Sequence, residues 1–420
     1  MTSATQLAEG QLEIAEHAHI ERSAGLGALA GRRIIIMLSE LELGGAERQA
    51  MVLARHLAEV QKAKVEVWGC AGGAPGRVTK LCEEYGIRWR ITPTPWGATR
   101  SLILKRLTKF AWLVRRQKPD VILSYLIFPN VVCAHVWRLT GAKLCIWNQR
   151  DEGIGRMPGA ERRAARMTRL FVSNSVGGAA FLIDELGVAR ERVRVIHNGV
   201  ELAPPLSDRE SVRRELGLDE DCFVACMVSN LTELKDHATL LRAWKLVVEA
   251  LEKEKRRAVL LLAGRLDSAD STHHRMKALA YDLELGRSVR FLGQVVDLSG
   301  LLSAVDLCVF SSRSEGSPNG VLECMAAGLA VAGTDIPGVR EALSPDSHRF
   351  LAPVGDTEAL ADRILKLASD GEERARLGAA NRLRVETEFS PQRMCEQNVA
   401  LIVDTLEGRP ASLSLITPRS

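Results

Sequence analysis

Long apolar runs and aromatic side chains are scarce in this sequence. Aromatic residues make up 5% of its 420 residues, and apolar stretches such as 258–263 are far too short to span a bilayer. The first thirty residues hold four glutamates and one arginine but no apolar core followed by a cleavage site, so we expect a polar tail and no secretory signal. The nine cysteines are scattered without a Cys-x-x-Cys pair, which argues against a disulfide framework or zinc site and favours a reducing cytoplasm.

Several catalytic signatures are missing as well. The sequence has no G-x-G-x-x-G dinucleotide fingerprint, no G-x-S-x-G nucleophile motif and no G-x-x-x-x-G-K-[ST] loop, so an NAD-dependent oxidoreductase, a triad hydrolase and a P-loop ATPase are not supported. Asp219-Glu220-Asp221 matches a D-x-D metal pattern, but three acids ahead of a strand are usually a solvated turn. We therefore expect no metal site.

The two halves of the chain have charge imbalances of opposite sign. Residues 31–200 carry 28 Lys and Arg against 14 Asp and Glu, whereas residues 201–420 carry 27 against 34. This asymmetry indicates two units with different partners. The basic half suits an anionic membrane surface or an anionic acceptor, and nucleic acid ranks last because no nucleic-acid-binding module accompanies it. The basic segment 105–118 also carries Phe110, Trp112 and Leu113 and can lie on a membrane, although a helix packed on a sheet looks the same.

Both halves alternate short apolar strands with amphipathic helices, which is the pattern of parallel α/β sheets. Ala203–Asp208, which includes Pro204-Pro205, has the composition of a linker. We expect a polar tail over 1–30, a first domain over 31–202, a linker over 203–210, a second domain over 211–389, a helix over 390–408 and a tail over 409–420, with a ligand cleft between the domains. The expected strands are Arg33–Leu38, Val65–Gly69, Val121–Ser124, Lys143–Trp147, Leu170–Ser173, Val193–Ile196, Cys222–Val228, Ala258–Ala263, Val289–Leu292, Leu307–Phe310 and Ala330–Gly333.

The most informative stretch is 311–326, which follows a strand-like run and leads into a helix-like run. Ser317 is expected to cap that helix and Pro318 to sit in its first turn, and the free N–H groups of such a helix start favour a phosphate. Glu315 lies just before the cap and Glu323 between one and two turns inside, so a phosphate there has a carboxylate on each side. Carboxylates accept hydrogen bonds from hydroxyls, which suits a nucleotide-sugar. A loop glutamate and a solvated helix glutamate are the open alternative.

Two other motifs follow strands. Lys235 comes after the first strand of the second half, at a helix start where a cation is poorly placed unless an anion lies beside it. A solvent-exposed lysine is the alternative. Gly44-Gly45-Ala46-Glu47-Arg48 follows the first strand of the chain, where glycines let a backbone approach a phosphate closely, and a simple tight turn is the alternative.

Together these residues resemble the retaining glycosyltransferases of family 4, which have the GT-B fold. The shared pattern is Glu-x7-Glu, here Glu315 to Glu323 within Ser-Glu-Gly-Ser-Pro-Asn-Gly-Val-Leu-Glu-Cys-Met-Ala. The resemblance implies two Rossmann-like domains facing each other across a cleft, with the acceptor at the first, the donor mainly on the second, and the last helix crossing back to brace the first. The other shared motifs, in an order that agrees over 31–408, are Gly44-Gly45-Ala46-Glu47-Arg48, Asn198-Gly199-Val200, Lys235, Leu262-Ala263-Gly264 and Phe291-Leu292-Gly293.

The resemblance also implies roles for single residues. Glu315 would contact hydroxyls of the transferred sugar, and Glu323 the ribose. The Lys235 ammonium and the amides at the helix start would hold the diphosphate, and Val295 would line the base pocket. Gly44 and Gly45 would let the first domain's loop close over the reacting centre. The residues implied at the donor are Gly44, Gly45, Asn230, Lys235, Val295, Glu315, Gly316, Asn319, Gly320, Val321 and Glu323.

Two positions depart from the family pattern. Many relatives carry an arginine where this chain has Asn230, so one phosphate contact is missing or comes from elsewhere, such as an arginine of the first domain. Many also carry histidines after the third or fourth strand, where this chain reads Leu123-Ser124-Tyr125 and Trp147-Asn148-Gln149-Arg150-Asp151. Arg150 is the expected replacement near the transferred group, and it joins Glu315 and Lys235 as a catalytic candidate.

We therefore expect a retaining hexosyltransferase that needs no metal or cofactor. It would move a sugar from a UDP- or GDP-linked donor to a glycan or lipid-linked acceptor in cell-surface polysaccharide or glycolipid synthesis. No protein nucleophile is evident, and front-side attack, which the family is thought to use, requires the protein to stabilise diphosphate charge and align the reactants. The expected location is the cytoplasm, in peripheral contact with the inner face of the plasma membrane. A nucleotide-sugar 2-epimerase and a non-catalytic sugar-nucleotide binder remain open, the latter because of Asn230.

Overall fold

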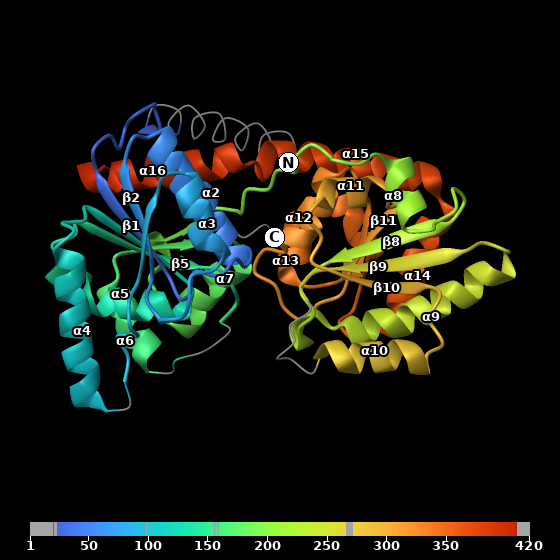
Figure 1. Ribbon diagram of the computed structural model, residues 1–420, viewed down its shortest axis with the longest axis horizontal. Coiled ribbons are helices and arrows are strands. Elements are labelled where there is room, and N and C mark those ends of the chain that lie inside the picture. The colour runs from blue at the N-terminus through green and yellow to red at the C-terminus, as the bar shows by residue number, and fades with distance from the viewer. Residues whose placement is uncertain are drawn as a thin grey trace, which may run out of the picture. The chain divides into compact units, whose positions relative to one another are not determined.

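The chain divides into two compact α/β units, Met1–Gly199 with Pro391–Ser420, and Val200–Ser390 (Figure 1). The computed structural model describes residues 20, 23–97, 99–153, 157, 159–265 and 272–409. Each unit is a parallel sheet covered by helices, so the expected α/β fold is confirmed.

The first unit holds a seven-stranded sheet in the order β3-β2-β1-β4-β5-β6-β7, and all its strand pairs among the described residues are parallel. Its strands are β1 (Arg33–Leu38), β2 (Lys64–Gly69), β3 (Arg88–Ile91), β4 (Val121–Tyr125), β5 (Leu144–Gln149), β6 (Leu170–Ser173) and β7 (Val193–Val195). Its helices are α2 (Gly45–Glu59), α3 (Arg77–Glu84), α4 (Arg100–Arg115), α5 (Ile127–Thr140), α6 (Ala160–Met167), α7 (Val176–Ala180), the π-helical turn η1 (Phe181–Glu185), the 3-10 turn η2 (Arg190–Arg192) and α16 (Pro391–Glu407).

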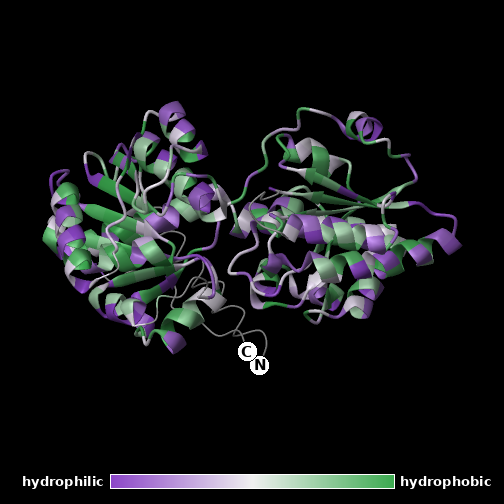
Figure 2. Ribbon diagram, turned by 60° about the horizontal axis from the view of Figure 1, so that its bottom comes forward, coloured by the Kyte–Doolittle hydropathy of each residue, from purple (hydrophilic) through white to green (hydrophobic). Residues whose placement is uncertain are grey.

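Both faces of this sheet are buried. Ile34 and Ile36 of β1 pack into one cluster with α2, α3 and α16, whereas Ile35 and Met37 pack into another with α4 and α5. Successive side chains of a strand point to opposite faces, so a strand covered on both sides needs an unbroken apolar run rather than alternation. The strands are accordingly the most uniformly hydrophobic parts of the ribbon (Figure 2).

The second unit holds a six-stranded parallel sheet in the order β10-β9-β8-β11-β12-β13. Its strands are β8 (Phe223–Val228), β9 (Ala258–Ala263), β10 (Val289–Gly293), β11 (Leu307–Phe310), β12 (Val331–Thr334) and β13 (Leu351–Ala352). Its helices are α8 (Arg209–Glu215), α9 (His237–Lys253), α10 (Thr272–Asp282), α11 (Leu298–Ser303), α12 (Asn319–Ala326), α13 (Pro337–Ala342), α14 (Thr357–Ser369) and α15 (Gly371–Glu388), with the 3-10 turns η3 (Glu233–Lys235) and η4 (Pro345–Phe350).

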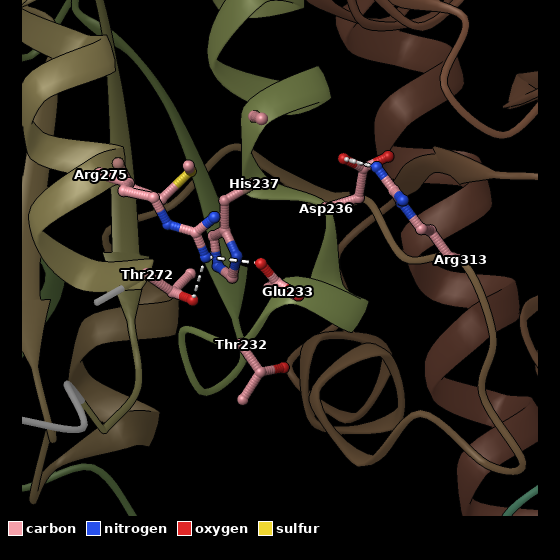
Figure 3. A pocket seen from close by; sticks show the side chains of 9 residues that line it. Thr232, Glu233, Asp236, His237, Thr272, Arg275 and Arg313 are labelled. Atoms are coloured by element: carbon pink, nitrogen blue, oxygen red, sulfur yellow. Dashed lines mark hydrogen bonds and ion pairs between the residues drawn. The ribbon is translucent and has the colours of Figure 1, made fainter. Parts of the chain in front are cut away.

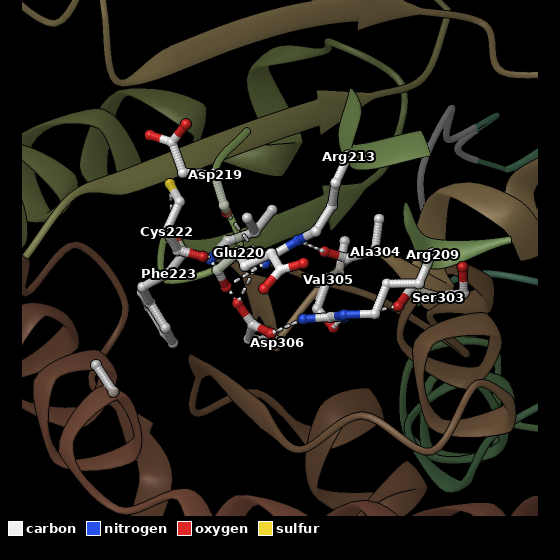
Figure 4. A network of polar contacts seen from close by, with 12 residues as sticks. Arg209, Arg213, Asp219, Glu220, Cys222, Phe223, Ser303, Ala304, Val305 and Asp306 are labelled. Carbon is white, nitrogen blue, oxygen red and sulfur yellow. Dashed lines mark hydrogen bonds and ion pairs between the residues drawn. The ribbon is translucent and has the colours of Figure 1, made fainter. Parts of the chain in front are cut away.

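A network of polar contacts fixes α8 to the amino ends of β8 and β11 (Figure 4). The carboxylate of Asp306 accepts hydrogen bonds from Arg209 Nη2 at 2.7 Å, from Arg213 Nη2 at 3.1 Å and from the Val224 amide at 2.8 Å. The guanidinium of Arg213, whose side chain is 6% exposed, also donates to the carbonyl of Cys222 at 2.7 Å. Because the N–H donors of Arg213 are satisfied in this way, its buried positive charge is tolerated.

The segment expected to link the units, 203–210, lies in the second unit. The amides of Leu206 and Ser207 each donate to Asp297 at 3.0 Å, and α8 already begins at Arg209. The division between the units falls at Gly199, before the expected domain end at 202. At the other end, α16 packs its Met394, Val399 and Ile402 with the first unit's core, so the last helix does cross back.

Two of the strands, β3 and β13, were not predicted from the sequence. The strand β3 alternates arginine with Trp89 and Ile91 at the edge of the first sheet, and β13 has only two residues. Neither has the apolar run that marked the buried strands.

Candidate functional site

The glutamate and lysine singled out in the second half lie at adjacent strand ends. Lys235 follows β8 and Glu315 follows β11, and these strands are neighbours. Strand order reverses beside β8, because β9 and β10 extend to one side and β11, β12 and β13 to the other. In open parallel sheets, ligands bind at the carboxyl ends of the strands at such a switch point.

Lys235 and Glu315 form an ion pair through Lys235 Nζ and Glu315 Oε1. Their side chains are 21% and 11% exposed, so neither is the solvated side chain that the sequence left open. Ser312 Oγ also donates to Glu315 Oε1, at 2.8 Å, and the lysine ammonium stands 5.4 Å from the centre of the Phe310 ring. Both contacts use Oε1, which leaves Oε2 without a hydrogen-bond partner among the described residues.

The helix after Glu315 begins one residue later than expected. Pro318 is the N-cap of α12 and the helix starts at Asn319, so the expectation that Ser317 caps it is wrong. No side chain caps this start. A Cβ on Gly320 would lie 1.8 Å from the carbonyl oxygen of Val228, which only a glycine avoids. The absence of that Cβ lets the first turn of α12 lie directly against the carboxyl end of β8.

Glu323 lies on α12 and is 7% exposed. The solvated helix glutamate that the sequence left open is therefore excluded. Gly316 is buried between the two acids, Val321 is fully buried, and Asn319 and Gly320 are half-buried.

The other implied donor residues line the same edge of the sheet. Asn230 follows β8, and its Oδ1 accepts the amide of Arg265 at 3.0 Å, so it joins the loops after β8 and β9. Gly264 makes that approach possible, because a Cβ there would lie 1.9 Å from the Ser229 carbonyl oxygen. Val295 follows β10 and is partly buried against the core.

A cavity of about 200 Å³ lies between the loop after β8, the start of α10 and Arg313 (Figure 3). Its arginines are already paired, since Arg275 contacts Glu233 at 2.6 Å and Arg313 contacts Asp236 at 3.5 Å. The lining imidazole of His237 is 2% exposed. Burial, with a smaller contribution from the charge of Lys235, lowers the pKa of His237 to about 4, so this histidine is neutral near pH 7.

The first unit holds the remaining candidates. Gly44 is the extended N-cap of α2, and Gly45 is the first residue of that helix. Arg150 follows β5 and is 9% exposed; burial lowers the pKa of its guanidinium. A residue that the sequence analysis missed is Gln49, whose side chain donates to the carbonyl of Gly199 and accepts its amide, each at 3.0 Å.

Within the described residues, no helix combines the length and apolar composition needed to cross a membrane. The same residues contain no group of three or more His, Cys, Asp or Glu side chains placed to hold a metal ion. Asp219, from the D-x-D match, instead pairs with Arg257.

Two family models match the chain, one in each half. Residues 43–203 match "Glycosyltransferase Family 4", and residues 208–384 match "Glycosyl transferases group 1". Among curated proteins, N-acetyl-alpha-D-glucosaminyl L-malate synthase from Bacillus anthracis is 23% identical over 71% of this chain and 78% of its own. Lipopolysaccharide core biosynthesis glycosyltransferase LpsE from Rhizobium meliloti is 27% identical over 72% and 82%.

Solved structures show the same fold. A glycosyltransferase from Rickettsia africae superposes with a TM-score of 0.77 at 19% identity, over 90% of this chain and 99% of its own. Anabaena HepE, in complex with UDP-glucose, superposes with a TM-score of 0.75 at 20% identity, over 90% and 99%. Matched in both halves by family models and in fold by solved enzymes, the chain belongs to the group 1 glycosyltransferases with the GT-B fold.

Proposed function

We propose that this protein is a retaining glycosyltransferase that moves a sugar from a UDP-sugar to a glycan or lipid-linked acceptor of the cell surface. The observation that carries the proposal is the joint placement of Lys235, Glu315 and the start of α12 at the switch point of the second sheet. The complexes of HepE with UDP and UDP-glucose support the donor class. The name of the LpsE relative supports a role in cell-surface glycan synthesis.

The second unit offers positive charge where a diphosphate would leave. The first amides of α12 and the ammonium of Lys235 converge beside β8, and both favour an anion. Preorganised groups of this kind stabilise the charge that develops on a leaving diphosphate. In this proposal they do so without a metal ion or any other cofactor.

Glu315 would bind the sugar rather than attack it. Its Oε1 is held by Lys235 and Ser312, so the carboxylate is oriented, and Oε2 can accept a hydroxyl of the sugar. With no protein nucleophile assigned, the leaving phosphate would take the acceptor proton as the acceptor attacks from the same side. The Glu323 carboxylate would bind the ribose, and the stretch near Val295 the base.

The test is transfer by purified protein from UDP-glucose and related UDP- and GDP-sugars to membrane glycolipid extracts. Glu315→Gln should abolish transfer while the protein stays folded. Glu249→Gln on the exposed face of α9 is the matched control, because it removes a surface glutamate that, among the described residues, pairs with Lys245 alone, at 3.5 Å. Transfer by Glu315→Gln at the rate of the control would remove the assignment. Conversion of the donor in the absence of acceptor would favour an epimerase instead.

We also propose that α4 brings the first unit to an anionic cytoplasmic membrane surface. Leu104 and Trp112 of this helix are 68% and 54% exposed, and Lys105, Lys109 and the C-cap residue Arg116 are exposed as well. The guanidinium of Arg116 lies 4.8 Å from the centre of the Trp112 ring. Between Glu84 and Asp120 the sequence has no acidic residue, so this face attracts anionic lipid.

Vesicle sedimentation tests this contact. Wild-type protein should bind vesicles containing phosphatidylglycerol and ignore vesicles of phosphatidylcholine alone. Trp112→Ala should weaken that binding about tenfold, because an interfacial tryptophan and its apolar area are lost. Equal binding of wild type and Trp112→Ala would remove α4 from the contact.

A further inference from the structure

Several buried polar atoms that lack hydrogen-bond partners gather in one place in the first unit. Buried polar groups are almost always paired, so a group of orphaned atoms calls for an explanation such as a bound ligand or water. The atoms without a partner among the described residues are Tyr125 Oη, Asn130 Oδ1, Asn148 Nδ2, Arg150 Nε and Asn174 Oδ1.

Arg150 is the centre of this group, which we call the Arg150 cluster. Its Nη1 donates to Asn198 Oδ1 at 3.1 Å and its Nη2 to Asn148 Oδ1 at 3.4 Å. Its guanidinium also lies 4.7 Å from the centre of the Tyr125 ring. Two of its nitrogens are therefore used, and its Nε–H is left over.

The two remaining members contact the same backbone. Asn130 Nδ2 donates to the carbonyl of Asn148 at 2.9 Å, and Asn174 Nδ2 donates to the carbonyl of Arg150 at 3.4 Å. In both amides the nitrogen is used and the oxygen is orphaned. The five orphaned atoms thus belong to one connected set.

The cluster lies at the carboxyl ends of β4, β5 and β6, the edge at which parallel sheets bind ligands. The backbone is strained there, since Leu126, between Tyr125 and α5, has φ +69°. Such strain in a residue other than glycine is common at binding sites. The first turn of α5, which contains Asn130, also points its partial positive charge at this edge.

The cluster contains a buried cation without a counter-ion. Within the described part of the chain Arg150 forms no ion pair, and its two acceptors are neutral amide oxygens. A guanidinium that is 9% exposed and uncompensated is costly, and burial accordingly lowers its pKa. An anion would remove that cost.

The orphaned atoms also describe the rest of the ligand. Arg150 Nε and Asn148 Nδ2 are donors that an anionic oxygen would satisfy, and the Tyr125 hydroxyl, which lies beside the guanidinium, can donate its own hydrogen to the same anion. The orphaned oxygens of Asn130 and Asn174 accept hydrogen bonds, which hydroxyls supply. A hydroxylated anion satisfies both kinds at once.

We propose that the Arg150 cluster binds a carboxylate or phosphate group carried by a hydroxylated acceptor, such as an acidic or phosphorylated sugar. The inference rests on the proposed function in one respect, because it is transfer that makes the ligand an acceptor. The anion site itself can be measured without any transfer.

The test measures the rise in unfolding temperature that inorganic phosphate causes, with chloride at matched ionic strength as the reference. It uses the Lys235→Ala protein, in which the second unit has lost its cation for phosphate. The decisive variant is Asn148→Asp, which places a carboxylate of almost the same shape beside Arg150. Arg150→Lys keeps the charge but loses the fork of donors, and Arg162→Gln, an exposed arginine of the same unit, is the control.

Phosphate should stabilise the Lys235→Ala and Arg162→Gln proteins alike. Asn148→Asp should keep or raise the unfolding temperature without phosphate but bind phosphate at least about tenfold more weakly, because the charge of Arg150 is already compensated. Arg150→Lys should fall between the two. Retention of the full phosphate effect by Asn148→Asp would mean that phosphate acts at another site, and would overturn the proposal.

A second arm separates the acceptor from the donor as the source of the anion. In wild-type protein saturated with UDP, the phosphate effect should remain and should still depend on Asn148 and Arg150. Abolition of that effect by UDP would place the donor's diphosphate at Arg150 and would overturn the acceptor assignment. Failure of sugar transfer with the phosphate effect intact would count against the proposed function alone.

Discussion

Glu315→Gln should strengthen the binding of UDP while it abolishes sugar transfer. Without a donor, Lys235 is engaged by Glu315, whose side chain is 11% exposed. A diphosphate that recruits Lys235 must share it with that carboxylate. Removal of the carboxylate charge leaves the whole ammonium for the phosphates, so a substitution that destroys the sugar contact should improve the nucleotide contact.

The size of the effect follows from the burial of the pair. A hydrogen bond to a charged group contributes about 1.5–3 kcal/mol, and the 21% exposure of Lys235 screens part of this. We expect the free energy of unfolding of the free protein to fall by about 1–2 kcal/mol. The loss of the pair should reappear in part as tighter binding, with a dissociation constant for UDP about fivefold lower, or about 1 kcal/mol.

Isothermal titration calorimetry with UDP, which lacks the sugar, measures this directly. Glu249→Gln serves as the control because its carboxylate lies on an exposed helix face. If UDP binds Glu315→Gln no more tightly than it binds the control, Lys235 does not reach the diphosphate and the donor geometry proposed here fails.

Three further substitutions test how the structure of the second unit supports this site. The unfolding free energy should fall by about 2 kcal/mol between about pH 7 and about pH 5, as measured by denaturant titrations. The reason is that His237 has a pKa of about 4 in the folded protein and 6.5 in the unfolded chain, so the unfolded chain binds the proton first as the pH falls. In the His237→Gln protein the fall in unfolding free energy over the same pH range should be smaller by about 2 kcal/mol. Gly320→Ala should destabilise the protein by about 1–3 kcal/mol and weaken UDP binding, because the added Cβ would clash with the carbonyl of Val228. Gly286→Ala is the control and should have neither effect in the same assays, because nothing lies within 4 Å of its added Cβ. Asp306→Asn should lower the unfolding free energy by about 1–2 kcal/mol in urea titrations, because two arginines lose the charge of a shared, partly exposed carboxylate, and an unchanged midpoint would contradict this role.

The fold was predictable because burial on both faces of a parallel sheet leaves a direct mark in the sequence. Strands β9 and β11 are unbroken apolar runs, β1 is one after its first residue, Arg33, and the predicted bounds of all three agree with the structure. Strand β3 left no such mark, because its arginines at 88 and 90 lie at the sheet edge and alternate with the partly buried residues. Its place is set by pairing with β2, which is a property of the fold rather than of those four residues.

The second unit's site was predictable in its members but not in its contacts. Glu315 and Lys235 could be chosen because each follows a strand, and such ends meet at one edge of a parallel sheet. Their ion pair joins residues 80 positions apart, and the sequence gives no sign of it. The mistaken cap at Ser317 has a local reason, since the chain stays extended through Pro318 and the helix starts with the next residue.

The sequence contains a pattern that indicates the Arg150 cluster, although the sequence analysis did not recognise it. Asn148, Asn174 and Asn198 stand at or just after the ends of β5, β6 and β7, so three consecutive strands deliver an asparagine to the same edge. One asparagine after a strand is usually a turn residue. Recurrence at successive strand ends is different, because neighbouring strands bring those side chains together.

The two units therefore differ in whether their cation has a carboxylate partner: Lys235 has one, and Arg150 has none among the described residues. This difference predicts how each unit responds to its ligand. Lys235 is already paired with Glu315, so a phosphate must compete for it, and specificity there depends on ligand groups that also satisfy the displaced carboxylate. A sugar hydroxyl can do so, which favours a complete nucleotide-sugar over free phosphate. Arg150 has no carboxylate to displace within the described residues, so any anion of the right size relieves its cost directly. The second unit should accordingly discriminate among donors by their sugars, and the first among acceptors by their charge.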